Sequence, residues 1–325
     1  MHFPSIVAIL LSVSLLSCNT RSKKKPSEQT KTSESEAPAV YKSALVEARE
    51  HFKTKLVKFN QMKEKPETPP KGLFSAVSFP TKIGNMDAYL GKVPEDGKLH
   101  PAMIWLTGGM GNGIDRVWEK ADADNDQTAS VFRKAGLVMM YPTQRGGGMS
   151  PGYEESFYGE IDDIIAARDF LAKQKGVDSN RIYLGGHSTG GTKALLVAES
   201  TDKFNAVFSF GPVSSVVLYG ADDLTYDVKN KEENILRAPG AWLKDIVTPT
   251  YVFEGNAGES NVNELRLLKN LAEEKGGNLH FYEIDGKDHF SGLQPASVII
   301  AKGIMENNLI FRDELFKIVY WEVGK

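Results

Sequence analysis

Short apolar runs alternate with stretches of helical periodicity over most of the chain after Gly72. The runs that predict strands are 74–79, 86–93, 102–106, 137–141, 181–184, 206–210, 251–254 and 278–284. Apolar residues spaced three or four positions apart predict helices at 126–134, 159–174, 189–199, 261–275 and 297–307. The first two strands look like an antiparallel pair, and the later ones are apolar on both faces. This alternation predicts an α/β fold over residues 72–325, with a mostly parallel eight-stranded sheet and helices on both faces.

The first residues of the sequence predict an export signal. The apolar run 6–17 is too short to span a bilayer, so residues 1–17 are interpreted as a signal peptide, although its first residues carry no Lys or Arg. Leu15-Leu16-Ser17-Cys18 resembles a bacterial lipobox, which predicts a lipid on Cys18. The expected location is the bacterial cell envelope, with the protein anchored to a membrane and facing the periplasm or the exterior. An ordinary secretory signal with a chance cysteine is the alternative.

Two further segments precede the predicted domain. Residues 18–39 are rich in Ser, Thr, Lys, Glu and Pro and predict a flexible linker. Residues 40–71 predict an amphipathic helix, with apolar positions from Val40 to Phe59, followed by a spacer that Pro66, Pro69 and Pro70 keep out of the helix. This helix either caps the domain or props it away from a membrane.

The charge distribution limits the partners. The net charge of −3 implies no polyanion-binding surface, so no nucleic acid partner is expected. Residues 18–65 nevertheless hold 12 Lys and Arg against 6 Asp and Glu. A basic arm of this kind suits a tether beside an anionic membrane, and a solvated linker is the plainer interpretation. The body has no cysteine and therefore no disulfide bond.

The pentad Gly186-His187-Ser188-Thr189-Gly190 has the form G-x-S-x-G, between a predicted strand and a predicted helix. A nucleophile elbow requires this setting, because side chains at the flanking glycines would clash in the sharp turn. Ser188 is the predicted nucleophile, and the Thr189 N–H is a predicted oxyanion donor. The alternative is a glycine-rich turn in which Ser188 only caps the next helix.

A glycine-rich loop follows the third predicted strand. It has the sequence Thr107-Gly108-Gly109-Met110-Gly111-Asn112-Gly113 and lacks the spacing of a nucleotide-binding loop. Gly109 is predicted to give the second oxyanion N–H, and Met110 would replace it only with an equally directed N–H.

The base and the acid are expected late in the chain. His289 lies in a loop after the last predicted strand and is the histidine with the required order and setting. Two glutamates are candidates for the acid. Glu259 is favoured over Glu254, because it lies close to the usual acid position, which Gly258 occupies here. Its role would be to orient His289 and to stabilise the imidazolium ion.

No cofactor or metal is expected. Asp122, Asp124 and Asp126 resemble the start of a calcium loop, but Gln127 and Arg133 stand where that loop needs glycine and glutamate. Residues 213–247 predict a modest lid whose apolar side chains, Tyr219 among them, either shape the substrate site or pack on the core.

From about Ser75 to Leu309 the chain resembles the α/β-hydrolase superfamily, and within it the catalytic domain of the prolyl oligopeptidase type. The most specific part is Ala135–Leu196, with Arg145-Gly146-Gly147-Gly148 and a second glycine, Gly191, after the elbow. Two departures weaken the likeness to a peptidase. The chain before Ser75 is too short for the propeller of true oligopeptidases, and Thr107 replaces the histidine before the oxyanion glycines.

The resemblance implies two-step acyl transfer on a small-molecule ester or a short peptide. Ser188 would attack the carbonyl, His289 would take its proton, and water would release the acyl group. The alternative from another functional class is a non-catalytic lipoprotein that uses a decayed hydrolase fold as a binding module.

Overall fold

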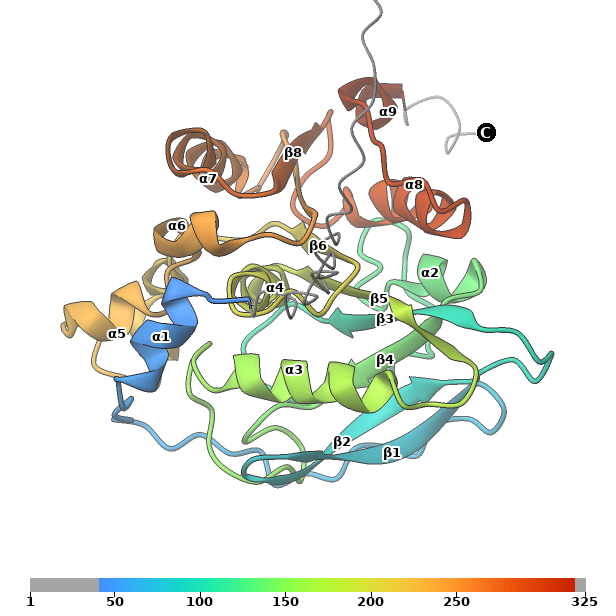
Figure 1. Cartoon of the computed structure of the whole chain (residues 1–325), viewed down its shortest axis with the longest axis horizontal. Helices are drawn as coiled ribbons and strands as arrows, with labels where there is room; N and C mark the ends of the chain where they lie inside the picture. The colour runs from blue at the N-terminus through green and yellow to red at the C-terminus, as the bar shows by residue number, and fades with distance from the viewer. Residues whose placement is uncertain (1–40, 319–325) are drawn as a thin grey trace, which may run out of the picture. The chain divides into compact units, whose positions relative to one another are not determined.

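The computed structural model describes residues 41–318 (Figure 1). The predicted signal peptide, the predicted linker and Cys18 therefore lie outside the described residues. Among residues 41–318, no helix has the length and apolar character needed to cross a membrane.

The eight predicted strands form one sheet. They are β1 (Phe74–Thr81), β2 (Gly84–Gly91), β3 (His100–Leu106), β4 (Val138–Pro142), β5 (Val177–His187), β6 (Ala206–Phe210), β7 (Thr250–Gly255) and β8 (Leu279–Ile284). The strand order is β1-β2-β4-β3-β5-β6-β7-β8. The pairs β1–β2 and β2–β4 are antiparallel, and every later pair is parallel. The prediction of a mostly parallel eight-stranded sheet is confirmed.

Each face of the sheet supports its own hydrophobic core. In β3, Ala102 and Ile104 contribute to the core under the helices α3 (Glu160–Leu171), α4 (Thr189–Ala198) and α7 (Val262–Lys275). Met103 and Trp105 contribute to the core under α2 (Ser130–Lys134) and α8 (Leu293–Met305). This division follows from the two-residue period of a strand, which sends neighbouring side chains to opposite faces. Because helices cover both faces, most side chains of the central strands are apolar and buried (Figure 1).

The α-helices are α1 (Ala44–Glu50), α2 (Ser130–Lys134), α3 (Glu160–Leu171), α4 (Thr189–Ala198), α5 (Lys231–Ile235), α6 (Pro239–Trp242), α7 (Val262–Lys275), α8 (Leu293–Met305) and α9 (Asp313–Ile318). Short 3₁₀ helices lie at Val216–Tyr219 (η1), Ala221–Asp223 (η2) and Leu243–Asp245 (η3). Thus α5, α6 and the 3₁₀ helices occupy the segment predicted as a lid.

Helix α2 is shorter than predicted. The pattern suggested a helix from residue 126, but α2 begins at Ser130. The Asp126 carboxylate accepts bonds from the Ser130 backbone N–H, at 3.0 Å, and from the hydroxyls of Ser130 and Thr128. Aspartate in this role favours a turn, because its side chain competes with the helical hydrogen bonds of the backbone. The aspartate run therefore forms a turn that leads into α2.

The N-terminal helix is also shorter than predicted, because α1 ends at Glu50. Residues 51–71, here called the strap, continue with little regular structure. Leu56 forms a β-bridge with Tyr226, and the backbone N–H of Val57 donates to Thr225 O at 2.7 Å. The prediction of a helix up to Phe59 is wrong here, because pairing with the lid outweighs the weak helical propensity of the strap.

Helix α1 caps the domain. Leu45 is fully buried in the core, and its backbone N–H donates to Asp245 Oδ2 at 2.9 Å. The Tyr41 hydroxyl donates to Asp245 O at 2.6 Å. These contacts decide between the two roles that the sequence left open for this helix.

Candidate active site

Ser188 lies at a strained elbow between β5 and α4. Its backbone has φ 55° and ψ −116°, a conformation that is unfavourable for a residue with a side chain. The flanking glycines are required sterically. A Cβ on Gly186 would come 2.4 Å from Gly190 O, and a Cβ on Gly190 would come 2.2 Å from Leu106 O. The sequence pattern G-x-S-x-G therefore corresponds to a nucleophile elbow in space.

His289 reaches the elbow from the loop after β8. Its ring centroid lies 4.5 Å from that of His187, the residue before Ser188. Its carbonyl oxygen lies 2.9 Å from His187 Nε2. The carboxyl ends of parallel strands meet at one edge of the sheet, so the ends of β5 and β8 bring these histidines together.

The carboxylate that contacts the His289 ring belongs to Glu254, near the end of β7. Glu254 Oε2 lies 3.1 Å from His289 Nδ1, and the Glu254 side chain is 1% exposed. Glu259, the favoured acid of the sequence pattern, contributes its backbone instead, because its carbonyl accepts from the His289 N–H at 2.9 Å. Glu259 thus positions the histidine loop, and Glu254 takes the place predicted for Glu259.

Gly211, directly after β6, makes room for the Glu254–His289 pair. A Cβ on Gly211 would lie 2.4 Å from both Glu254 Oε2 and His289 Cε1. The backbone of Gly211 has φ +59°, and its N–H donates to Phe253 O at 2.8 Å. Gly211 was the residue in the sequence that could have pointed to Glu254 as the partner of His289. That inference requires the spatial order of β6, β7 and β8, which the sequence does not give.

The oxyanion donors predicted from sequence lie beside one another. The Thr189 hydroxyl donates to Gly109 O at 2.6 Å, and Gly109 adopts φ +94°. In a trans peptide the C=O and the following N–H point in opposite directions. The N–H of Met110 therefore points away from the Thr189 hydroxyl, and Gly109 stays the predicted second donor.

A buried ammonium group holds the far end of this glycine loop. Lys193, in α4, donates to Asn112 Oδ1 and to Gln144 Oε1, both at 2.7 Å. Asn112 Nδ2 donates to Glu160 Oε1 at 2.9 Å. Burial lowers the pKa of Lys193, while the carboxylates of Glu160 and Glu154 act in the opposite direction. These bonds connect the glycine-rich loop at Asn112 to α4 and to α3.

Arg145 extends the same network. It forms two side-chain bonds to the Asp163 carboxylate, each at 2.9 Å, and one to Glu155 at 2.7 Å. Its carbonyl accepts from Asn112 Nδ2 at 2.8 Å. Bidentate pairing of this kind gives the arginine one fixed orientation. The sequence pattern singled out Arg145 by resemblance, and the structure gives it a physical role in holding the Asn112 end of the loop.

Tyr219 is a site residue that the sequence pattern grouped with the lid. Its hydroxyl lies 2.7 Å from Thr192 Oγ1, and its ring stacks on Phe157 with centroids 5.4 Å apart. Burial raises the pKa of Tyr219, and hydrogen bonds with the hydroxyls of Thr192 and Ser188 act in the opposite direction. A protonated phenol therefore lies beside the nucleophile.

His187 is buried and neutral. Burial lowers its pKa to about 3, and the neighbouring His289 ring acts in the same direction. A carbonyl oxygen only accepts, so the bond to His289 O requires the proton on Nε2. On the other side of the ring, Gln127 Oε1 lies 2.9 Å from Nδ1 and also accepts from the Gly108 N–H at 3.2 Å. His187 therefore supports the carbonyl of the predicted base.

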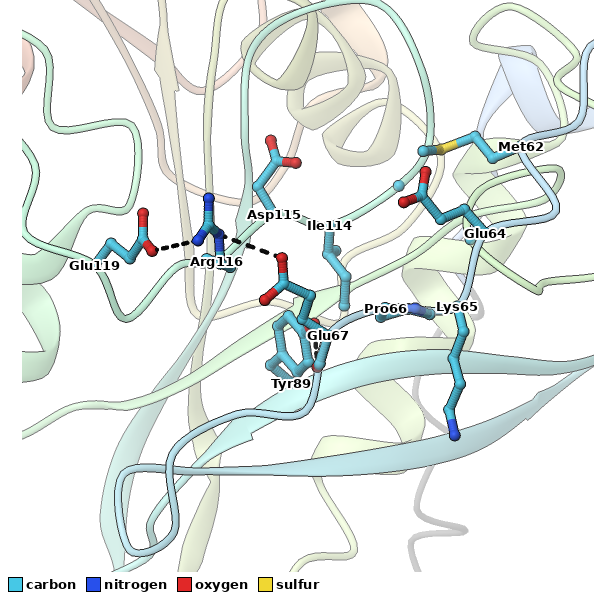
Figure 2. Close-up of a pocket in the computed structure, with 12 residues that line it drawn as sticks. Met62, Glu64, Lys65, Pro66, Glu67, Tyr89, Ile114, Asp115, Arg116 and Glu119 are labelled. Carbon is cyan, nitrogen blue, oxygen red and sulfur yellow. Dashed lines mark hydrogen bonds and ion pairs between the residues drawn. The ribbon is translucent and has the colours of Figure 1, made fainter.

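A cavity of about 320 Å³ lies at the end of the glycine-rich loop 107–113, here called the oxyanion loop after its predicted role. The cavity lies between Gly113 and the strap (Figure 2). Arg116 lines it and forms ion pairs with Glu119 at 2.8 Å and with Glu67 at 3.4 Å. Met62 and Glu64 line it from the strap. Within the described residues 41–318, no cluster of three or more His, Cys, Asp or Glu side chains is arranged to hold a metal ion.

Comparison with known proteins supports the fold. Residues 123–239 match the prolyl oligopeptidase family, which confirms that resemblance for this region. No functionally curated sequence matches the chain significantly.

Three solved structures illustrate the likeness. Dipeptidyl peptidase 4 of Porphyromonas gingivalis is 17% identical, with a TM-score of 0.58 over 75% of this chain and 36% of that one. Acylaminoacyl peptidase of Pyrococcus horikoshii is 15% identical, with a TM-score of 0.59 over 75% and 44%. An esterase of Pyrobaculum calidifontis is 18% identical, with a TM-score of 0.53 over 81% and 89%. The chain thus spans less than half the length of either peptidase. It has the α/β-hydrolase fold.

Proposed function

We propose that this α/β-hydrolase chain is a serine hydrolase that cleaves an ester or amide bond through a covalent acyl-enzyme. The observation that carries the proposal is the strained elbow at Ser188 beside the hydrogen-bonded pair of His289 and Glu254. Strain in the backbone of a residue with a side chain is concentrated at functional sites, where the surrounding structure imposes it.

The pair assigns the proton positions. Glu254 accepts from His289 Nδ1, so the lone pair of the neutral ring is on Nε2. This nitrogen takes the proton of Ser188 as the hydroxyl oxygen attacks the substrate carbonyl, and it later gives that proton to the leaving group. Glu254 keeps the ring in the required tautomer and stabilises the imidazolium ion that forms.

The tetrahedral intermediate carries a negative oxygen that needs prearranged donors. The backbone N–H groups of Gly109 and Thr189 are the proposed donors, and the bond between Thr189 Oγ1 and Gly109 O fixes one against the other. Helix α4 begins at Thr189 and directs the positive end of its dipole to the same point. Water then attacks the acyl-enzyme and restores Ser188.

A small-molecule ester or a short peptide is the proposed substrate. The cavity at the end of the oxyanion loop has room for a small ligand. The likeness to the esterase extends over 89% of that enzyme, so esters are the first substrates to test.

A fluorophosphonate probe tests the nucleophile. We expect wild type to be labelled and Ser188→Ala to lose both the label and about 10⁵- to 10⁶-fold of turnover. Ser78→Ala, an exposed position on β1, is the matched control and should be labelled like wild type. Folded wild type that takes no label would favour the non-catalytic binding module instead.

Two substrate series separate the finer activities. p-Nitrophenyl acyl esters of increasing chain length are compared with prolyl and alanyl anilides under the same conditions. A preference for esters in kcat/KM identifies an esterase, and a preference for anilides identifies a peptidase.

We further propose that Cys18 carries a lipid that anchors the exported protein to a bacterial membrane. The sequence Leu15-Leu16-Ser17-Cys18 after an apolar run supports this. In detergent phase partitioning, wild type should enter the detergent phase and Cys18→Ala should remain in the aqueous phase. The anchor is excluded if both proteins stay in the aqueous phase.

A further inference from the structure

Five exposed apolar side chains gather on one surface beside the cavity of Figure 2. This surface, here called the apolar rim, consists of Phe59, Met62, Ile83, Met149 and Tyr153. Their exposed fractions lie between 40% and 66%. They come from three segments, namely the strap, the β1–β2 turn and the loop after β4. A contiguous apolar surface built from separate segments differs from single exposed apolar residues, which are common on soluble proteins.

Contacts join three of these side chains, and the shared cavity places the other two nearby. Phe59 packs edge-on against Tyr153, with ring centroids 5.3 Å apart. Ile83 lies against the neighbouring Gly152, where an added Cβ would come 2.8 Å from Ile83 Cδ1. The loop that carries Tyr153 also carries Met149. Next to Met149, Gly148 lines the same cavity as Met62.

Lysines accompany the apolar residues of the rim. Lys58 precedes Phe59, Lys63 follows Met62, and Lys82 precedes Ile83. The strap as a whole holds six lysines against two glutamates. Among residues 41–318, no carboxylate forms an ion pair with Lys63 or Lys82, and both side chains are exposed.

The carboxylates near the rim contact residues other than the rim lysines. Glu67 pairs with Arg116, and Glu154 lies 3.5 Å from Asn60 Nδ2. Glu64 and Lys65 both line the cavity, and the Lys65 side chain extends away from the Glu64 carboxylate (Figure 2).

We propose that the apolar rim and its lysines dock on the surface of an anionic membrane. Apolar side chains enter the interface between headgroups and acyl chains, while neighbouring lysines reach the negative headgroups. A protein partner fits this surface less well, because lysine is depleted in protein interfaces. A second copy would bring like charges together.

Docking would place the cavity next to the lipid. Met62 belongs both to the rim and to the lining of the cavity, which reaches the oxyanion loop at Gly113. A substrate carried in the lipid layer would then meet the cavity at the Gly113 end of the glycine-rich loop. This consequence depends on the proposed hydrolase function, whereas the docking itself does not.

Vesicle sedimentation tests the docking. The full chain is used with Cys18→Ala in every variant, so that no lipid is attached to the protein. Vesicles of phosphatidylcholine are compared with an equal mixture of phosphatidylcholine and phosphatidylglycerol. We expect binding to the mixed vesicles only, weakened by added salt.

Two double variants address the two parts of the surface. Lys63→Glu with Lys82→Glu should weaken binding about 30-fold, since each lysine near an anionic surface contributes about fivefold. Phe59→Ser with Ile83→Ser should weaken it at least as much, because apolar burial is lost. Both variants should hydrolyse a water-soluble p-nitrophenyl ester as wild type does, if the proposed activity is present.

The control pair is Lys98→Glu with Leu99→Ser. It combines one substitution of each kind, and Leu99 is 65% exposed, but the pair lies before β3, at the amino end of the parallel strands. The control should bind like the parent. Equal binding to both vesicle types, equal losses in the control, or rim variants that change a dimer into a monomer without altering vesicle binding would each overturn the proposal. Loss of hydrolysis with intact binding would overturn only the proposed function.

Discussion

The two sides of the candidate site are held in different ways. On the proposed proton-transfer side, Ser188 directly follows β5, Glu254 lies in β7 and His289 lies in the loop after β8, and the Glu254–His289 bond measures 3.1 Å. On the oxyanion side, Gly109 belongs to a glycine-rich loop that is tied down by Asn112 and the buried ammonium group of Lys193.

The difference follows from the backbone. Strand ends in a parallel sheet are rigid and converge at one edge, so residues placed there need little further support. A glycine-rich loop has no such rigidity, and its conformation has to be imposed by contacts from outside. Buried charged groups provide strong and directional contacts of this kind. Substitutions on the proposed proton-transfer side should therefore lower kcat by removing a reacting group. Substitutions on the proposed oxyanion side should lower kcat by displacing the loop that carries Gly109.

The largest effect that separates the two sides is expected from the acid. Glu254→Gln should lower kcat about 10⁴-fold, because the amide stabilises the wrong tautomer of His289 and no longer stabilises the imidazolium ion. Glu259→Gln is the matched control. It should keep kcat within about threefold, since its backbone carbonyl makes the contact with His289. Steady-state kinetics with an activated ester measure both. The reverse order would return the acid role to Glu259.

Removal of the buried ammonium group tests the oxyanion side. Lys193→Met should lower kcat about 10²- to 10³-fold, the size of a lost oxyanion donor, with a smaller change in KM. It should also destabilise the fold by about 3 kcal/mol in urea unfolding, because Asn112 and Gln144 lose their partner. Lys203→Met, at an exposed pair with Asp169, is the control and should change neither value much. A stability loss with unchanged kcat would show that Lys193 does not position the loop.

Tyr219→Phe should have a smaller effect, because it removes one hydrogen bond at the nucleophile and keeps the stacking on Phe157. We expect kcat to fall about 5- to 10-fold with little change in KM. Tyr153→Phe, in the exposed rim, serves as the control in the same assay. An unchanged kcat in Tyr219→Phe would show that the hydroxyl does not contribute to turnover and that Tyr219 acts only through the packing of its ring.

The smallest effect concerns pH. Burial lowers the pKa of His187 from 6.5 to about 3, so the unfolded chain takes up a proton that the folded protein refuses. The free energy of unfolding contributed by His187 is complete above pH 6.5 and declines as the pH falls towards 3. Nitrogen NMR of the imidazole rings should show His187 with its proton on Nε2 and unchanged between pH 7 and pH 5. Titration near 6.5 would contradict its burial as a neutral ring.

Much of the site followed from local sequence. The elbow could be predicted because its glycines, strand and helix are consecutive in the chain, and the structure gives Ser188 the expected strained backbone. The placement of His289 after the last strand needed only the order of the elements. The acid could not be predicted in this way. Glu254 and Glu259 are five residues apart, and their roles depend on where Gly211 leaves space.

The conformation of the strap and the position of Tyr219 also could not be predicted from local sequence. Apolar residues at helical spacing predicted a helix as far as Phe59, but the lid offers a backbone partner at Thr225 and Tyr226 that no local pattern reveals. Tyr219 was one aromatic residue among several in the lid. Its position beside Ser188 depends on the stacking with Phe157, a residue distant in the chain.

The sequence by itself determined the eight-stranded α/β sheet, the elbow at Ser188 and the order in which a base follows it, because periodicity and glycine sterics act between near neighbours. The tertiary structure decided that Glu254 contacts His289, that Lys193 and Asn112 hold the oxyanion loop, and that the strap lies extended beside the lid. Those choices depend on burial, charge pairing and free space between distant segments. Such quantities exist only once the chain has folded.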